Sequence, residues 1–286
     1  MRRILAVFLL VFMFFNLSAT AESSVIHNKI KNPDDPFTFP EDTQLLEIYF
    51  PKIYDNLSAF IRYGEYTMLL DSPGDQWQQT YALLQQLNVT ELDYAFLSHP
   101  HTDHMYGFQF ILADIPADVF VHTFPEESPH NSVAAPKVYA ALHELGVPFL
   151  RLSSDDEIDL GDIGFTTYQL DDDKSGNNSS TMIHLTFGDC SILFPADVQI
   201  NSQRAYAAQK IPIASDIMVA PHHGYNNTQQ VFLDLVQPEL VIITSLRSSA
   251  NVLTCLKNNS ISYLFTDIGT LRLTTDGSAW IVERIK

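Results

Sequence analysis

Short apolar runs separated by polar turns recur along most of the chain. Runs rich in β-branched, aromatic and leucine residues predict strands. The predicted strands cover residues 45–50, 59–63, 66–70, 92–97, 119–122, 149–152, 165–170, 181–187, 191–194, 216–220, 240–244, 263–267, 270–275 and 279–283. Helical spacing predicts helices over residues 76–87, 136–145 and 250–256, with another beginning near residue 107. This alternation is compatible with an α/β protein but does not define its topology.

The loop after the predicted strand 92–97 concentrates metal-binding side chains. Four potential ligands, His99, His101, Asp103 and His104, lie within six positions, although the chain has only 10 histidines in 286 residues. His99 and His101 are two apart, so in extended backbone both side chains point to the same side. Imidazole and carboxylate ligands suit zinc first, with manganese or iron as alternatives. The simpler interpretation is a polar loop whose histidines hydrogen-bond locally.

Three further polar elements also follow predicted strands. Asp71 follows strand 66–70, Asp197 follows strand 191–194, and His222 and His223 follow strand 216–220. Strand ends are common positions for functional side chains in α/β proteins. The alternatives are a turn-capping role for Asp71, an N-cap role for Asp197, and surface positions for the two histidines.

The sequence His-x-His-x-Asp-His after an apolar strand resembles the signature of the metallo-β-lactamase superfamily. The Asn177 to Ser180 loop and Pro221-His222-His223-Gly224 resemble a subset of it, the hydrolase domains of bacterial competence DNA-uptake proteins and their secreted relatives. The resemblance covers about residues 44–286. It implies an αββα four-layer sandwich, an α/β (α+β) fold in which two sheets pack face to face, helices lie outside and the metal loops gather at one edge.

The resemblance also implies a role for each candidate residue. Two Zn²⁺ ions are expected, with Mn²⁺ as the alternative, and Asp197 bridges them. Asp103 would also orient the nucleophile, and His223 would contact the substrate or a leaving oxygen; which of His222 and His223 binds metal stays open. Asp71 would orient a ligand histidine. The expected metal ligands are His99, His101, Asp103, His104, Asp197 and His222.

One feature departs from the superfamily pattern. Many members carry a third histidine for the first metal upstream of the bridging aspartate, where this chain has Asn177 to Ser180. His184 is nearby but falls in the middle of a predicted strand. The first site could therefore be weaker, hold a different metal, or take Asp171, Asp172 or Asp173 as a ligand.

The N-terminus has the three parts of a secretory signal peptide. Met1-Arg2-Arg3 is basic, Ile4 to Phe15 is apolar, and Ala19-Thr20-Ala21 offers a small-x-small cleavage site. An uncleaved anchor is the alternative, but the run is shorter than the roughly 20 residues of a membrane span. We therefore expect a signal peptide over residues 1–21, a secreted protein, an arm or linker over 22–43 and a hydrolase domain over 44–286.

Charge and cysteine content narrow the possible partners. The chain has 16 basic and 34 acidic residues and a net charge of −18, which disfavours binding of nucleic acid through its phosphate backbone. A small-molecule or envelope phosphoester substrate is favoured. Cys190 and Cys255 could form one disulfide or remain two thiols. The oligomeric state is open.

The function that the resemblance implies is hydrolysis of a phosphodiester or related ester by a metal-bound hydroxide. A lactonase or β-lactamase-type hydrolase is the enzymatic alternative. A catalytically degenerate binding protein of the same fold is the alternative from another class. The chain has no Gly-x-Ser-x-Gly motif, which disfavours covalent catalysis by a serine nucleophile.

Overall fold

The computed structural model describes residues 29–31, 37–152, 158–170 and 176–285. These residues form two mixed sheets. The first, nine-stranded sheet has the spatial order β1 (Ile30–Lys31), β15 (Trp280–Ile285), β14 (Thr270–Thr275), β2 (Leu46–Phe50), β3 (Ala59–Tyr63), β4 (Tyr66–Leu70), β5 (Leu92–Leu97), β6 (Ala117–His122) and β7 (Phe149–Arg151). The second, six-stranded sheet has the order β13 (Ser262–Phe265), β12 (Leu240–Ile243), β11 (Ile217–Val219), β10 (Cys190–Phe194), β9 (Met182–Phe187) and β8 (Gly164–Tyr168).

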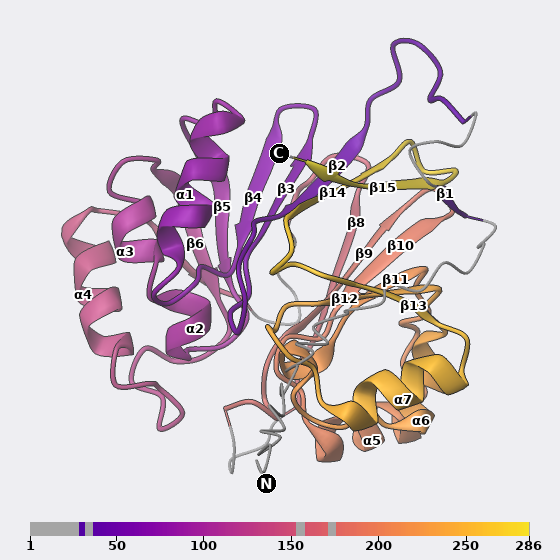
Figure 1. Ribbon diagram of the computed structural model, residues 1–286. Coiled ribbons are helices and arrows are strands. Elements are labelled where there is room, and N and C mark those ends of the chain that lie inside the picture. Colours follow the sequence, from indigo (N-terminus) through magenta and orange to yellow (C-terminus); the bar gives the residue numbers. More distant parts are fainter. Residues whose placement is uncertain (1–28, 32–36, 153–157, 171–175, 286) are drawn as a thin grey trace, which may run out of the picture.

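Helices cover the outer face of each sheet (Figure 1). The first sheet carries α1 (Trp77–Gln86), α2 (Thr102–Met105), α3 (Phe108–Ile111) and α4 (Ala135–Glu144). The second sheet carries α5 (Ile200–Gln209), α6 (Gln230–Val236) and α7 (Ala250–Asn258). The layers are therefore helix, sheet, sheet and helix, which confirms the expected αββα sandwich.

The hydrophobic periodicity of the strands divides the core into three layers. In β2, Leu46, Ile48 and Phe50 face the space between the sheets, whereas Tyr49 packs on the helix side. The ring of Phe50 stacks on Phe194 from the second sheet, with 5.9 Å between ring centroids. Alternate residues of a strand point to opposite faces, so both faces of this strand are covered by packed layers.

The opening meander folds as its sequence predicts. β2, β3 and β4 pair antiparallel, and Gly64 takes a φ of +59° in the turn between β3 and β4. Glycine adopts this left-handed conformation without a Cβ penalty. β4, β5, β6 and β7 then pair in parallel, so the loops after β4 and β5 leave the same edge of the sheet.

Some elements differ from expectation. The segment expected to be an arm contains β1, which pairs with β15 at Trp280 and Ile281, so part of it belongs to the sheet. α6 was not predicted, because its apolar stretch is short and flanked by polar residues. Its own side chains Phe232, Leu233 and Val236 are buried. The expected signal peptide, residues 1–21, lies outside the described residues.

Cys190 and Cys255 are both free thiols in this structure. Cys190 is buried and Thr275 Oγ1 lies 3.1 Å from its sulfur. The structure therefore has two unpaired thiols rather than one disulfide. Separately, none of the helices in the described ranges combines the length and apolar content that a membrane span requires.

Candidate metal centre

Three strand ends supply the candidate metal ligands. The loop after β5 carries His99 and His101, and α2 begins directly after it and carries Asp103 and His104. Asp197 follows β10, and the short helix η1 (Pro221–Gly224) follows β11. Because β10 and β11 are parallel neighbours, their carboxyl ends bring these side chains to one edge of the sandwich.

The side chains form two groups that share Asp197. One group contains Asp103, His104, Asp197 and His223, and the other contains His99, His101 and Asp197; in each, the potential ligand atoms lie within 4.8 Å of one another.

The two oxygens of Asp197 face different groups. Oδ1 lies 3.2 Å from His104 Nε2 and 3.5 Å from His223 Nε2. Oδ2 lies 3.6 Å from His99 Nε2. Asp197 could therefore contribute one oxygen to each of two cations, which fits the bridging role that the resemblance implies for it.

The donor set fits divalent metal ions. His99 is fully buried, and its Nε2 has no hydrogen-bond partner among the described residues. An unpaired buried nitrogen is costly, and a cation between His99, His101 and Asp197 would satisfy it. Neutral imidazole and carboxylate are ligands for zinc and related transition metals.

Asp71 holds His104 in the orientation that a metal ligand needs. Its Oδ2 lies 2.7 Å from His104 Nδ1, so this nitrogen donates the hydrogen bond and leaves Nε2 directed at Asp197. Ser98 contributes two more hydrogen bonds, from its backbone N to Oδ1 and from its hydroxyl to Oδ2, each 2.7 Å long. This geometry is the supporting role that the resemblance implied for Asp71.

Thr244 plays the corresponding part for His223, and sequence reasoning missed it. Its hydroxyl oxygen lies 2.9 Å from His223 Nδ1, which leaves Nε2 facing Asp103 Oδ2 at 3.1 Å. Thr244 follows β12, and its sequence position carries no signal, because a threonine at a strand end is common. The contact spans 21 residues and exists only once β11 and β12 pair.

The structure separates the two adjacent histidines. The resemblance implied His222 as a ligand of the site that contains Asp103 and His104 but left the choice between His222 and His223 open; here His223 joins that group and His222 does not. Both residues have a left-handed φ, +50° and +57°, and the resulting turn directs His223 inward and leaves His222 nearer the surface, with 24% of its side chain exposed. Nε2 of His222 lies 3.5 Å from Asp197 Oδ2, the oxygen that faces His99.

The electrostatics favour cation binding. Burial lowers the pKa of His99 well below its usual range and lowers the pKa of His101, so both are neutral and can ligate. Burial opposes protonation of His104, but the carboxylates of Asp197, Asp71 and Asp103 outweigh it and raise its pKa. A proton on His104 therefore balances these carboxylates. A bound cation would replace it, so metal binding should release a proton.

The region of the missing histidine lies beside the metal loop. Thr181 N donates to Ser98 O over 3.0 Å, and a Cβ added to Gly176 would sit 3.0 Å from His101 Nε2. Asn178 instead accepts hydrogen bonds from the Ser202 hydroxyl. His184 is buried in β9, outside both groups. Asp171, Asp172 and Asp173 lie outside the described residues.

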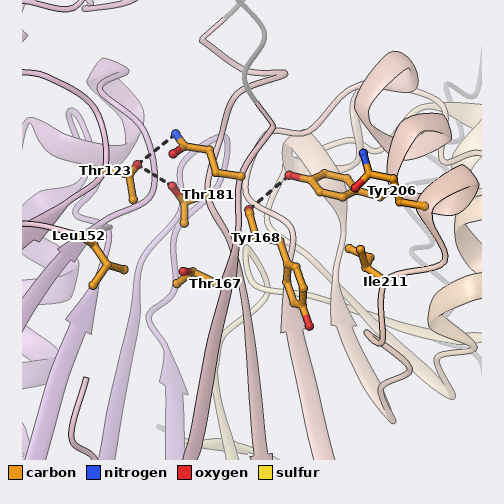
Figure 2. Close-up of a pocket in the computed structure, with 9 residues that line it drawn as sticks. Thr123, Leu152, Thr167, Tyr168, Thr181, Tyr206 and Ile211 are labelled. Atoms are coloured by element: carbon orange, nitrogen blue, oxygen red, sulfur yellow. Dashed lines mark hydrogen bonds between the residues drawn. The ribbon is translucent and has the colours of Figure 1, made fainter. Parts of the chain in front are cut away.

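A separate pocket lies near β7 and β8, which are edge strands of the first and the second sheet (Figure 2). It measures about 380 Å³ and is lined by residues including Thr123, Thr181, Tyr168 and Tyr206. The Thr123 and Thr181 hydroxyl oxygens are 2.6 Å apart, and Gln169 Nε2 donates to Thr123 Oγ1 over 3.2 Å. No member of either metal group lines this pocket.

Comparison with known proteins agrees with this geometry. The model of the "Metallo-beta-lactamase superfamily" matches residues 54–243, a span that contains all six residues of the two groups and also His222. The chain belongs to the metallo-beta-lactamase superfamily. This family and the two His/Asp groups together identify a metal-dependent hydrolase of that fold.

A curated relative supports the expected subset. The chain is 25% identical over 191 residues to ComE operon protein 3 of Bacillus subtilis (strain 168). The match covers 63% of this chain but only 24% of that protein, so this chain corresponds to about a quarter of the relative. The distant homology to a competence protein is confirmed.

Solved structures show the same fold at low identity. The metallo-beta-lactamase fold protein YhfI from Bacillus subtilis has a TM-score of 0.53 and 12% identity, covering 78% of this chain and 96% of its own. CmlA, a diiron β-hydroxylase from Streptomyces venezuelae, has a TM-score of 0.53 and 14% identity, covering 84% of this chain and 55% of its own. Since one protein that shares this fold is a diiron β-hydroxylase, the fold alone does not define the reaction.

Proposed function

We propose that the protein is a secreted enzyme that uses two zinc ions to hydrolyse a phosphodiester or a related ester. The observation that carries this proposal is the shared carboxylate of Asp197, whose two oxygens face two separate groups of ligands. His99, His101 and Asp197 would hold one ion. Asp103, His104, His223 and Asp197 would hold the other.

Several features support the finer parts of the proposal. The imidazole-rich ligand groups favour zinc, with Mn²⁺ as the alternative. When bound, such ions lower the pKa of water and neutralise charge on a phosphoryl group. The basic and apolar N-terminal residues favour export. The net charge of −18 favours a small-molecule or envelope phosphoester over long nucleic acid.

The chain's own residues divide the remaining work. Asp103 is the most exposed carboxylate of the two groups, with 36% of its side chain accessible, so it can accept a hydrogen bond from an attacking water and orient it. Burial lowers the pKa of His222, so its ring is neutral and can donate to a substrate oxygen. His99 and His104 are fully buried, so bulk water does not reach the metal centre from their side.

The test combines metal analysis with hydrolysis of bis(p-nitrophenyl) phosphate. We expect two zinc ions per chain in the intact protein, and loss of both metal and hydrolysis in Asp197→Asn, because both groups share this carboxylate. Asp93→Asn is the matched control, since Asp93 accepts hydrogen bonds from Thr67 within the first sheet. Retention of both ions, or unchanged hydrolysis, in Asp197→Asn would reject the shared-carboxylate mechanism.

Export is tested separately on the natural host's culture medium. Cleavage after Ala21 should yield a mature protein that begins at Glu22, which N-terminal sequencing detects. Recovery of the full chain only from the cytoplasm would refute the proposed secretion without affecting the metal chemistry.

A further inference from the structure

Exposed apolar side chains gather beside one of the two metal groups. The described part of the chain exposes seven large apolar side chains. Three of them, Tyr54, Tyr225 and Leu246, are 43%, 42% and 45% exposed. Each is a neighbour of Asp55, Tyr54 in the sequence and the other two in space. We call these four residues the Tyr225 rim. Clustered exposed apolar groups often mark a ligand site, whereas single ones do not.

Contacts with Asp55 connect the rim. Asp55 Oδ1 accepts a hydrogen bond from Leu246 N over 3.0 Å, and burial together with the Asp55 carboxylate raises the pKa of the Tyr225 hydroxyl. One oxygen of the Asp55 carboxylate is therefore already engaged within the rim, and the Tyr225 hydroxyl stays protonated. What the rim offers to a ligand is the faces of two tyrosine rings and the methyl groups of a leucine.

The rim is attached to the Asp103 and His223 side of the metal centre. Asp55 N donates to Thr244 O over 2.7 Å, and Leu57 N donates to Asp103 O over 3.3 Å. The ring centroid of Tyr225 lies 6.3 Å from that of His223 and also 6.3 Å from that of His222. Asp103 and His222 are the partly exposed side chains of this centre, so the open side of the centre and the rim adjoin.

The backbone beneath Tyr54 is held in place by side chains. Gln76 bonds to Tyr54 twice, accepting from its N over 3.0 Å and donating to its O over 2.7 Å. Asn56 Nδ2 donates to the same carbonyl over 2.8 Å, and Asn56 Oδ1 accepts from Gly74 N over 2.6 Å. The loop between β2 and β3 is thus preorganised, which lowers the entropy cost of using it as a binding surface.

We propose that the Tyr225 rim binds a planar apolar group of the substrate and so makes the enzyme prefer aryl over small alkyl phosphoesters. This inference rests on the proposed function, because it needs the phosphate to lie at the metal ions. With the phosphate there, a substituent on the open side meets the Tyr225 ring first. Offset or edge-on contact between aromatic rings then adds affinity that a methyl group cannot obtain.

The experiment compares phenyl phosphate with methyl phosphate by titration calorimetry on the full, zinc-loaded protein. Wild type should bind phenyl phosphate roughly threefold to tenfold more tightly than methyl phosphate. Tyr225→Ala should bring the two affinities within about twofold of each other, whereas Tyr225→Phe, which keeps the ring, should retain most of the preference. Tyr54→Ala provides a second test from a different loop, in which the preference should fall in part.

Val231→Ala is the matched control, because Val231 is similarly exposed, at 48%, but lies on α6; it should keep the wild-type preference. Two results would overturn the proposed role of the Tyr225 rim. One is equal affinity of wild type for phenyl phosphate and methyl phosphate, and the other is an undiminished preference for phenyl phosphate in both Tyr225→Ala and Tyr54→Ala. A larger loss of affinity for phosphocholine than for phenyl phosphate in Tyr225→Ala would also overturn it and would indicate a cation site. If zinc-loaded wild type binds neither phenyl phosphate nor methyl phosphate, the proposed function fails, and the proposed role of the Tyr225 rim, which depends on it, fails as well.

Discussion

Replacing Asp71 with asparagine isolates the effect of one buried charge on the metal centre. Asp71 is fully buried and accepts hydrogen bonds from His104 and from Ser98. Its backbone has a φ of +54°, which asparagine also tolerates, so the substitution adds no backbone strain. The amide matches the carboxylate in shape but can no longer accept through both oxygens.

The magnitude follows from the 2.7 Å bond between Asp71 Oδ2 and His104 Nδ1. A hydrogen bond to a charged group contributes roughly 1.5–3 kcal/mol. Without it, His104 can carry its proton on Nε2, the nitrogen that faces the metal position. Loss of such a supporting carboxylate typically lowers metal affinity by about 10- to 100-fold, which matches this energy because about 1.4 kcal/mol corresponds to a factor of ten.

The assay is zinc competition with a chromophoric chelator, which resolves two affinities per chain. Asp71→Asn should weaken the site that contains His104 by about 10- to 100-fold and change the site that contains His99 and His101 much less. Asp93→Asn should lower the free energy of unfolding, measured by urea denaturation, and leave both zinc affinities unchanged. Equal weakening in the two variants, or unchanged zinc affinity in Asp71→Asn, would refute the argument.

Two other predictions test the assignment of the metal ligands and the ion pairs of Glu47. His223→Ala should lose one of two zinc ions by elemental analysis, whereas His222→Ala should retain both and hydrolyse more slowly; the reverse pattern would restore the original expectation for His222. Glu47 lies 2.6 Å from Arg62 and 2.7 Å from Arg272, so Glu47→Gln should lower the free energy of unfolding by about 1–2 kcal/mol at pH 7. Burial opposes ionisation of Glu47, but hydrogen bonds from Arg62 and Tyr49 outweigh it and lower its pKa. The contribution of Glu47 to the free energy of unfolding is therefore present above the unfolded pKa of about 4.3 and is lost as pH falls through the lower folded pKa. Urea denaturation should show that the difference in free energy of unfolding between wild type and Glu47→Gln is smaller at pH 3 than at pH 7. An equal difference at the two pH values would contradict this reasoning.

Local patterns were enough to find most strands and most candidate ligands, whereas the fold followed from the resemblance to a known superfamily. Strands such as β2 and β10 are visible because burial on one or both faces imposes a simple hydrophobic period. The metal loop is visible because four ligand types within residues 99–104 make an unusual concentration. Asp71 and Asp197 could be predicted because each ends an apolar strand near a turn. Helix α6 was missed because its stability comes from packing against the second sheet rather than from its own short pattern.

By itself, the amino-acid sequence determined the family, the layer architecture and the kinds of side chain available to a metal. Only the tertiary structure decided between His222 and His223, because their left-handed turn, not their order in the chain, determines which ring points inward. Likewise, Thr244 supports His223 across 21 residues, and Leu246 reaches Asp55 across 191. Such contacts depend on how strand ends and loops meet in space, and no local pattern records them, because each residue alone is ordinary for its position.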